Sequence, residues 1–298
     1  MAVGPHPEGL RLYFEPSPYA KTLPSRTPPP TDGSPRLYIY WCRFGPSACE
    51  TLGKTGGPFG KSSVGSHRAG PFRGHPREGL DPLGRSTQVS TLYDYSCVLT
   101  SSRQENEDRV QVIERGDDLV VVVADGAGGM RGGATASDAV ITAVMSALGS
   151  DGFNISDGAV WKKLLTDVDA KLARTMAGET TAIIAVIGDS GITGVSCGDS
   201  QAWVISETGI DDLTADQKKK RLGSGHAALV AFYQPRLDGT LVIATDGLWD
   251  YTWAEKVAEV VRGRAPGGAA EELQALVRLP SRGYSDDVGV VVVAPLTR

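Results

Sequence analysis

The 298-residue sequence predicts an α+β fold built from layers of strands and helices. Short apolar runs typical of strands outnumber the segments with helical spacing, and several runs are close enough along the chain for antiparallel hairpins. The helical segments occur in pairs rather than after every strand. A doubly wound parallel sheet would require a helix after nearly every strand, so the sequence favours the layered α+β fold over that architecture.

Proline and glycine divide the chain into two parts. Residues 1–88 contain 14 of the 18 prolines and 13 of the 37 glycines. Such a stretch buries too little apolar surface to offset its chain entropy, so we predict a disordered extension over 1–88 and a globular domain over 89–298. A short apolar stretch at residues 37–44, LYIYWCRF, is the exception. It would dock on the domain, dock on a partner, or be an apolar island without function.

From residue 88 onward, β-branched apolar runs predict strands, and apolar residues at helical spacing predict helices. Thr252 and Glu255 have the spacing of a capping box, which places the start of the third helix. The predicted helices are residues 134–148, 159–176, 252–262 and 269–279. The predicted strands are residues 88–100, 118–124, 180–187, 192–197, 202–205, 227–233, 240–244 and 288–294.

The charge and cysteine content argue against several classes of protein. The net charge is −5, and residues 89–298 carry 19 Lys and Arg against 29 Asp and Glu, which argues against nucleic-acid binding. Cys42, Cys49, Cys97 and Cys197 form no CxxC pair and no histidine cluster accompanies them, so no zinc site is expected. The sequence shows no secretory signal pattern and no apolar run of about 18 residues, so we expect a cytoplasmic protein without membrane contact.

Acidic residues recur at the end of predicted strands or in the turn beyond them. Alone, each has an ordinary explanation, because an Asp-Gly pair after a strand is usually a turn and an acidic pair is usually a cap or a solvated turn. Their repetition in one domain favours a shared site, where a divalent cation would relieve the repulsion between carboxylates. Oxygen donors without thiolates or histidines select Mg²⁺ or Mn²⁺ over zinc. These residues are Glu107, Asp108, Asp125, Asp199, Asp246, Asp286 and Asp287.

Six motifs follow one another in the order seen in a known family. They are RQENEDR, VVADGAGG, GETTAIIAV, GDSQAW, IATDGLWD and SDDVGVVVV, and through them residues 90–296 resemble the metal-dependent protein phosphatase 2C family of bacterial type. The resemblance implies a catalytic domain with a four-layer α/β/β/α sandwich, in which helices flank two central antiparallel sheets. It also implies a dinuclear Mg²⁺ or Mn²⁺ centre that activates a water for hydrolysis of phosphoserine or phosphothreonine on proteins.

The resemblance further implies which residues hold the two metal ions. Asp125 would be the catalytic bridge between them, and Gly126 would offer its carbonyl oxygen. Either Glu107 or Asp108 would hold one ion directly or through water, and Asp108 is the position usually involved. The remaining ligands of the second ion would be Asp246 and Asp286.

Other positions match or depart from the pattern of the family. Asp199 matches a residue linked to a third, weaker metal ion, which Asp246 would also reach. Arg103 matches the catalytic arginine that binds the substrate phosphate, and a planar guanidinium suits bidentate contact with phosphate oxygens. Asp287 stands where many relatives have Asn. Ala127 stands where many eukaryotic members have a His that protonates the leaving group.

Two functions remain open from the sequence. The first is a monomeric phosphatase that acts on phosphorylated proteins, with a Ser/Thr kinase as a reasonable substrate. The second is a non-catalytic pseudophosphatase that keeps the fold as a binding or regulatory module. The presence of all the metal-binding carboxylates favours the enzyme, because a binding module has no need of acids that repel one another. The basic run KKKR at 218–221 would attract phosphorylated or acidic partners, or would be a solvated turn.

Overall fold

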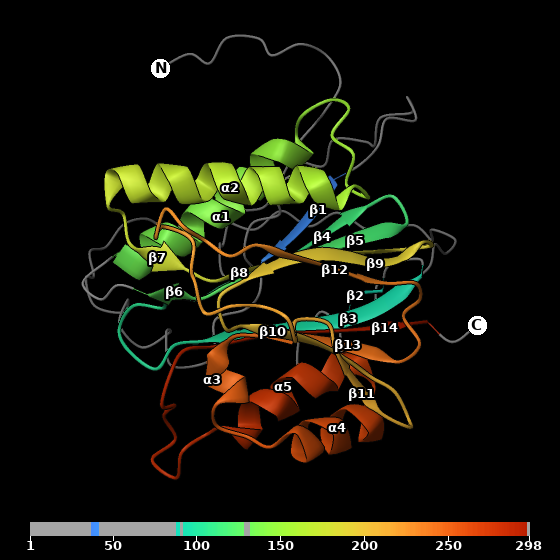
Figure 1. The fold of residues 1–298 in the computed structure, drawn as a ribbon. Helices are drawn as coiled ribbons and strands as arrows, with labels where there is room; N and C mark the ends of the chain where they lie inside the picture. The colour runs from blue at the N-terminus through green and yellow to red at the C-terminus, as the bar shows by residue number, and fades with distance from the viewer. Residues whose placement is uncertain (1–36, 42–87, 90–91, 128–131, 297–298) are drawn as a thin grey trace, which may run out of the picture.

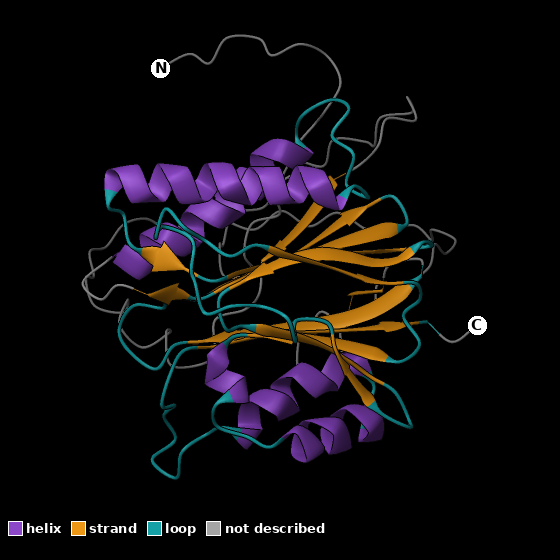
Figure 2. Cartoon of the chain, in the orientation of Figure 1, coloured by secondary structure: helices purple, strands orange, loops and turns teal. Residues whose placement is uncertain are grey.

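The computed structural model describes residues 37–41, 88–89, 92–127 and 132–296, with side chains described only within 92–127 and 132–296. Two β-sheets pack face to face, and helices cover the outer face of each sheet (Figures 1 and 2). The α+β prediction and the four-layer α/β/β/α sandwich are therefore confirmed. Most of the predicted disordered extension lies outside the described residues.

Sheet A, the first sheet, has six strands, and every neighbouring pair is antiparallel. Its edge strand β1 comes from the apolar stretch at 37–44 and pairs with β4, so part of that stretch docks on the domain. In spatial order the strands are β1 (Leu37–Trp41), β4 (Arg109–Arg115), β5 (Asp118–Ala124), β8 (Ala182–Gly188), β9 (Gly191–Cys197) and β12 (Val230–Gln234).

Sheet B is the second six-stranded antiparallel sheet. In spatial order its strands are β11 (Ile210–Asp212), β10 (Gln201–Ile205), β13 (Thr240–Ala244), β14 (Val288–Pro295), β3 (Tyr93–Thr100) and β2 (Gln88–Val89). A separate short pair consists of β6 (Gly126–Ala127) and β7 (Glu179–Thr180).

The helices divide between the two outer faces. Helices α1 (Gly132–Leu148) and α2 (Gly158–Thr175) cover sheet A, and their buried side chains share one cluster with β5, β8 and β9 (Figure 1). Sheet B is covered by α3 (Asp246–Trp249), α4 (Ala254–Gly263) and α5 (Pro266–Leu276). Among the described residues, no helix combines the length and the apolar character needed to span a bilayer.

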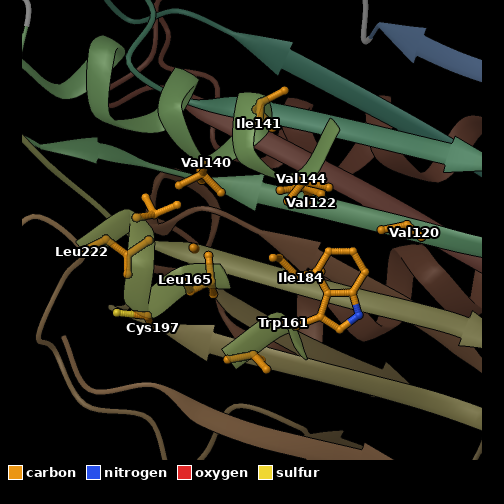
Figure 3. Close-up of a cluster of buried hydrophobic side chains, with 14 of the residues drawn as sticks. Val120, Val122, Val140, Ile141, Val144, Trp161, Leu165, Ile184, Cys197 and Leu222 are labelled. Atoms are coloured by element: carbon orange, nitrogen blue, oxygen red, sulfur yellow. The ribbon is translucent and has the colours of Figure 1, made fainter. Parts of the chain in front are cut away.

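The central strand β5 shows how one segment serves two layers of the core. Val120 and Val122 pack against the helices, in the cluster that also contains Trp161 of α2 (Figure 3). Val121 and Val123 point the other way, into the core between the sheets. Successive side chains of a strand point to opposite faces, so a strand buried on both faces appears in the sequence as a continuous apolar run.

Several predicted boundaries differ from the structure. The sequence did not reveal β4, because the polar residues of RVQVIER interrupt its apolar pattern. The capping box at Thr252 is wrong, since α4 begins at Ala254 with Trp253 as its N-cap and has no side-chain cap. Helix α5 begins at Pro266, three residues before the predicted start, because proline fits the first turn of a helix, where its missing N–H is not needed.

Candidate metal centre

Three of the predicted acids, Asp125, Asp199 and Asp246, lie close together. Asp125 directly precedes β6 and Asp246 begins α3, and both elements lie at one end of the sandwich (Figure 1). The start of β4 pairs with the end of β5, which brings Asp108 and Asp125 to the same edge. The end of β13 pairs with the start of β14, which does the same for Asp246 and Asp286. The prediction that these acids follow strands is wrong for Asp108 and Asp286, which precede β4 and β14. Antiparallel pairing still places them beside the acids that end strands.

Three carboxylates form the centre of this group. Asp125 follows β5, Asp199 lies between β9 and β10, and Asp246 is the first residue of α3. Each offers an oxygen, and these oxygens all lie within 4.8 Å of one another. Three negative charges at this spacing repel strongly unless protons or cations neutralise them.

Asp108 is a buried neighbour of these carboxylates, with 1% of the residue exposed. Its Oδ2 accepts a hydrogen bond of 2.7 Å from Thr245 Oγ1, and that hydroxyl in turn accepts one of 2.9 Å from the Gly289 N–H. Burial raises the pKa of Asp108 well above its usual value, and the neighbouring Asp125 carboxylate raises it further. The Thr245 hydroxyl, itself held by Gly289, positions a carboxyl group whose ionised form burial disfavours.

The pKa values of two other acids report the same repulsion. Burial, and next the Asp246 carboxylate, raise the pKa of Asp125 to about 7. Burial, followed by Asp286 and then Asp199, raises the pKa of Asp246 to about 6. The group therefore retains protons near neutral pH in the absence of metal, as expected for acids that a divalent cation would have to neutralise.

Arg221 is a residue of the site that sequence reasoning missed. Its Nη2 donates to both oxygens of Asp199, at 3.1 and 3.3 Å. The Nζ of Lys219 lies 4.0 Å from Asp199 Oδ2, on a side chain that is 84% exposed. Both cations belong to the basic run at 218–221, whose interpretation as a solvated turn is wrong for Arg221. The run itself was the only sequence signal, and nothing in it indicated which acid it would meet.

Backbone contacts fix the position of Asp125 after β5, and close packing requires glycine at position 126. The Asp125 N–H donates to Thr181 Oγ1 at 2.9 Å, and the Asp125 carbonyl accepts from the Thr181 N–H at 2.8 Å and from Thr180 Oγ1 at 2.9 Å. A Cβ atom on Gly126 would collide with the carbonyl of Gly133 in α1. Glycine thus lets the start of α1 approach the strand end, and the threonines fix the backbone that carries the Asp125 carboxylate.

Asp287 has a positioning role that the sequence did not reveal. Its Oδ1 accepts hydrogen bonds from the Ser102 N–H at 2.7 Å and from Ser102 Oγ at 2.9 Å. Its Oδ2 accepts from the Glu107 N–H at 2.7 Å. This buried carboxylate ties the loop between β3 and β4 to the start of β14. Asp287 therefore fixes the segment that leads into Asp108.

Two other predicted site residues lie on the loop between β3 and β4. A Cβ atom on Gly133 would lie 2.5 Å from Glu107 Oε1 and 2.7 Å from the Gly126 carbonyl oxygen, so the Glu107 side chain reaches the start of α1 beside Gly126, while Asp108 interacts with Asp125. Arg103 is exposed on the same loop, and its backbone N–H donates to Ser101 Oγ at 3.3 Å. The loop places Arg103 on the solvent side of the segment anchored by Asp287.

Comparison with known proteins finds a match to one family model. The model described as Protein phosphatase 2C matches residues 100–228, a range that contains Asp108, Asp125 and Asp199. The chain is similar to this family over 129 of its 298 residues. No curated protein sequence matches the chain.

Solved structures show the same fold at low sequence identity. The serine/threonine phosphatase PstP/Ppp of Mycobacterium tuberculosis is 19% identical with a TM-score of 0.57, and the match covers 70% of this chain and 100% of that one. The phosphatase Stp1 of Staphylococcus aureus is 19% identical with a TM-score of 0.58, and the match covers 72% of this chain and 99% of that one. The catalytic domain of PstP, solved in complex with two manganese ions, is 19% identical with a TM-score of 0.56, and the match covers 69% of this chain and 99% of that one.

The raised pKa values predict how the stability of the metal-free protein depends on pH. Aspartates in the unfolded chain titrate near about 3.9, whereas Asp125 and Asp246 titrate at about 7 and about 6 in the fold. Between these values the folded protein binds more protons, so its free energy of unfolding falls as the pH rises. We expect urea unfolding in EDTA to show this decrease between about pH 4 and about pH 7.

The double variant Asp125→Asn/Asp246→Asn is the control, because it removes two of the titrating groups and should make the decrease smaller. Saturating Mn²⁺ should stabilise the unaltered protein most at the higher pH, where the carboxylates are deprotonated. A metal-free protein whose stability stays constant or rises over this range would contradict the repulsion inferred from the structure.

The role of Asp287 gives a second prediction. Asp287→Ala leaves the N–H groups of Ser102 and Glu107 without their acceptor, which costs about 1–3 kcal/mol of unfolding free energy. Amide exchange in residues 101–108 should accelerate, as measured by hydrogen–deuterium exchange with mass spectrometry. Asp287→Asn keeps one acceptor oxygen, so its amide exchange should be faster than in the unaltered protein and slower than in Asp287→Ala. Unchanged amide exchange of residues 101–108 in Asp287→Ala would contradict this positioning role.

Proposed function

We propose that the chain hydrolyses phosphoserine and phosphothreonine on proteins with a water activated at a dinuclear Mg²⁺ or Mn²⁺ centre. The observation that carries the proposal is the convergence of carboxylate oxygens of Asp125, Asp199 and Asp246 within 4.8 Å. Burial and repulsion from neighbouring carboxylates raise the pKa values of Asp125 and Asp246. A divalent cation would relieve this unfavourable arrangement of charge.

The donor chemistry fits these metals. Four acids, Asp108, Asp125, Asp246 and Asp286, would hold two ions, with the carbonyl of Gly126 beside them. All of these donors are oxygens, which suit Mg²⁺ and Mn²⁺. When bound, two such ions lower the pKa of a shared water and supply hydroxide near neutral pH. The threonines that clamp the Asp125 backbone keep its carboxylate in place for this purpose.

Arg103 would bind the phosphate of the substrate. It lies on the exposed loop whose backbone is tied down by Asp287, so the loop is fixed while the guanidinium remains accessible. A guanidinium contacts two phosphate oxygens at once and neutralises the charge that spreads over them as the phosphorus–oxygen bond breaks.

Protonation of the leaving alkoxide must use solvent. Ala127 carries no acid, and the only histidine within the described residues, His226, is exposed in the segment before β12. A side-chain donor of the kind that a histidine at position 127 would provide is therefore missing. In this proposal the serine or threonine hydroxyl of the product takes its proton from water.

The third prediction tests the activity. The full chain should hydrolyse p-nitrophenyl phosphate and a phosphothreonine peptide with Mn²⁺, and EDTA should abolish both reactions. Asp125→Asn and Asp246→Asn should each lower kcat/KM by at least about 100-fold, since even outer-shell partners of metal sites contribute about 10–100-fold. Steady-state kinetics in Mn²⁺ would measure the effect.

Asp151→Asn is the matched control, because Asp151 is an exposed carboxylate beyond the C-terminal end of α1, whereas the N-terminal end of α1 meets Gly126. It should keep the unaltered rate. Metal-independent turnover, or full activity in Asp125→Asn, would contradict the mechanism. Tight Mn²⁺ binding without hydrolysis of either substrate would instead establish the alternative, a pseudophosphatase that senses a metal or a partner.

A further inference from the structure

The Asp199 carboxylate already has a cationic partner within the chain. The Nη2 of Arg221 donates to both of its oxygens, at 3.1 and 3.3 Å, and Lys219 approaches the same group at 4.0 Å. Arg221 is only partly exposed, unlike the lysines of the basic run. The guanidinium thus lies beside an acid whose nearest oxygen is within 4.8 Å of those of Asp125 and Asp246.

The backbone that carries Arg221 is anchored on both sides. Before it, Gln217 Nε2 donates to the Ser200 carbonyl at 2.6 Å, next to Asp199 itself. After it, Leu222 is fully buried and exchanges two backbone hydrogen bonds with Thr180, at 3.0 and 2.9 Å. These contacts therefore hold the backbone of Arg221 in a fixed position beside the acid group.

A buried carboxylate reinforces this anchoring beyond Leu222. Asp169 on α2 accepts hydrogen bonds from the N–H groups of Gly223 at 2.7 Å, Gly225 at 3.0 Å and Ala227 at 3.2 Å. Three donors on one carboxylate hold the turn after Arg221 against the helix. The position of the guanidinium is consequently part of the fold.

We propose that Arg221 is a built-in cation that occupies Asp199 in place of a third metal ion, so that the centre binds two divalent ions. The inference rests on the proposed metal centre. A guanidinium has five donors and no lone pair to offer a metal, so it cannot become a ligand beside Asp199. A divalent ion at this carboxylate would have to displace Arg221 or withstand its repulsion at close range.

The charges of the site balance with this assignment. Five carboxylates, Asp108, Asp125, Asp199, Asp246 and Asp286, carry −5 when all are ionised. Two divalent ions contribute +4 and Arg221 contributes +1, so these groups sum to zero when the exposed Lys219 is not counted. A third divalent ion would leave these groups with an excess of +2. Arg221 is a positioning residue in this scheme, because it acts on Asp199 and not on the substrate.

The experiment counts the metal ions bound by the metal-free full chain, using isothermal titration with MnCl₂ at neutral pH. We expect two ions for the unaltered protein and three for Arg221→Gln, which removes the charge but keeps a polar side chain. The additional ion should disappear in Arg221→Gln/Asp199→Asn. Arg221→Lys should bind two ions, since it restores the positive charge.

Asp199→Asn alone provides a measurement that does not depend on any change at Arg221. It should still bind two ions, because Asp199 is not a metal ligand while Arg221 occupies it. Three ions in the unaltered protein, two in folded Arg221→Gln, or one in Asp199→Asn would each overturn the inference. Absence of Mn²⁺ binding in the unaltered protein would overturn the metal centre as well, so the two failures are distinguishable.

Discussion

Repulsion between carboxylates is the constraint on which the rest of this structure depends. Burial, and next the neighbouring acids, raise the pKa of Asp125 to about 7 and that of Asp246 to about 6. A fold does not tolerate such a group without compensation. The Thr245 hydroxyl at Asp108 and the guanidinium of Arg221 at Asp199 supply part of this compensation. Divalent ions would supply the remainder.

The antiparallel sheets explain how acids far apart in the sequence meet. In such sheets, the start of one strand lies beside the end of the next, so residues just before β4 and β14 reach the same edge as residues just after β5, β9 and β13. Both faces of each sheet are packed, against the other sheet and against helices. The site therefore stands at the end of a rigid core, where small displacements of the ligands are resisted.

The sequence predicted the layers and the acidic group but not the contacts that position it. The strand 118–124 was predictable because an uninterrupted run of valines strongly favours a buried strand. Strand β4 was not predictable, because its polar residues interrupt the apolar pattern. Asp287 and Arg221 could not be assigned from sequence. Their roles depend on partners more than 20 residues away, Ser102 and Asp199, which only the folded chain brings near.

The most direct test of the central claim is to locate the metal ions themselves. Crystals of the full chain grown with Mn²⁺ and measured at the manganese absorption edge should show two anomalous peaks. Both should lie among the carboxylates of Asp108, Asp125, Asp246 and Asp286, with neither bound to Asp199. No anomalous peak in this group, or peaks at unrelated surface acids, would contradict the account.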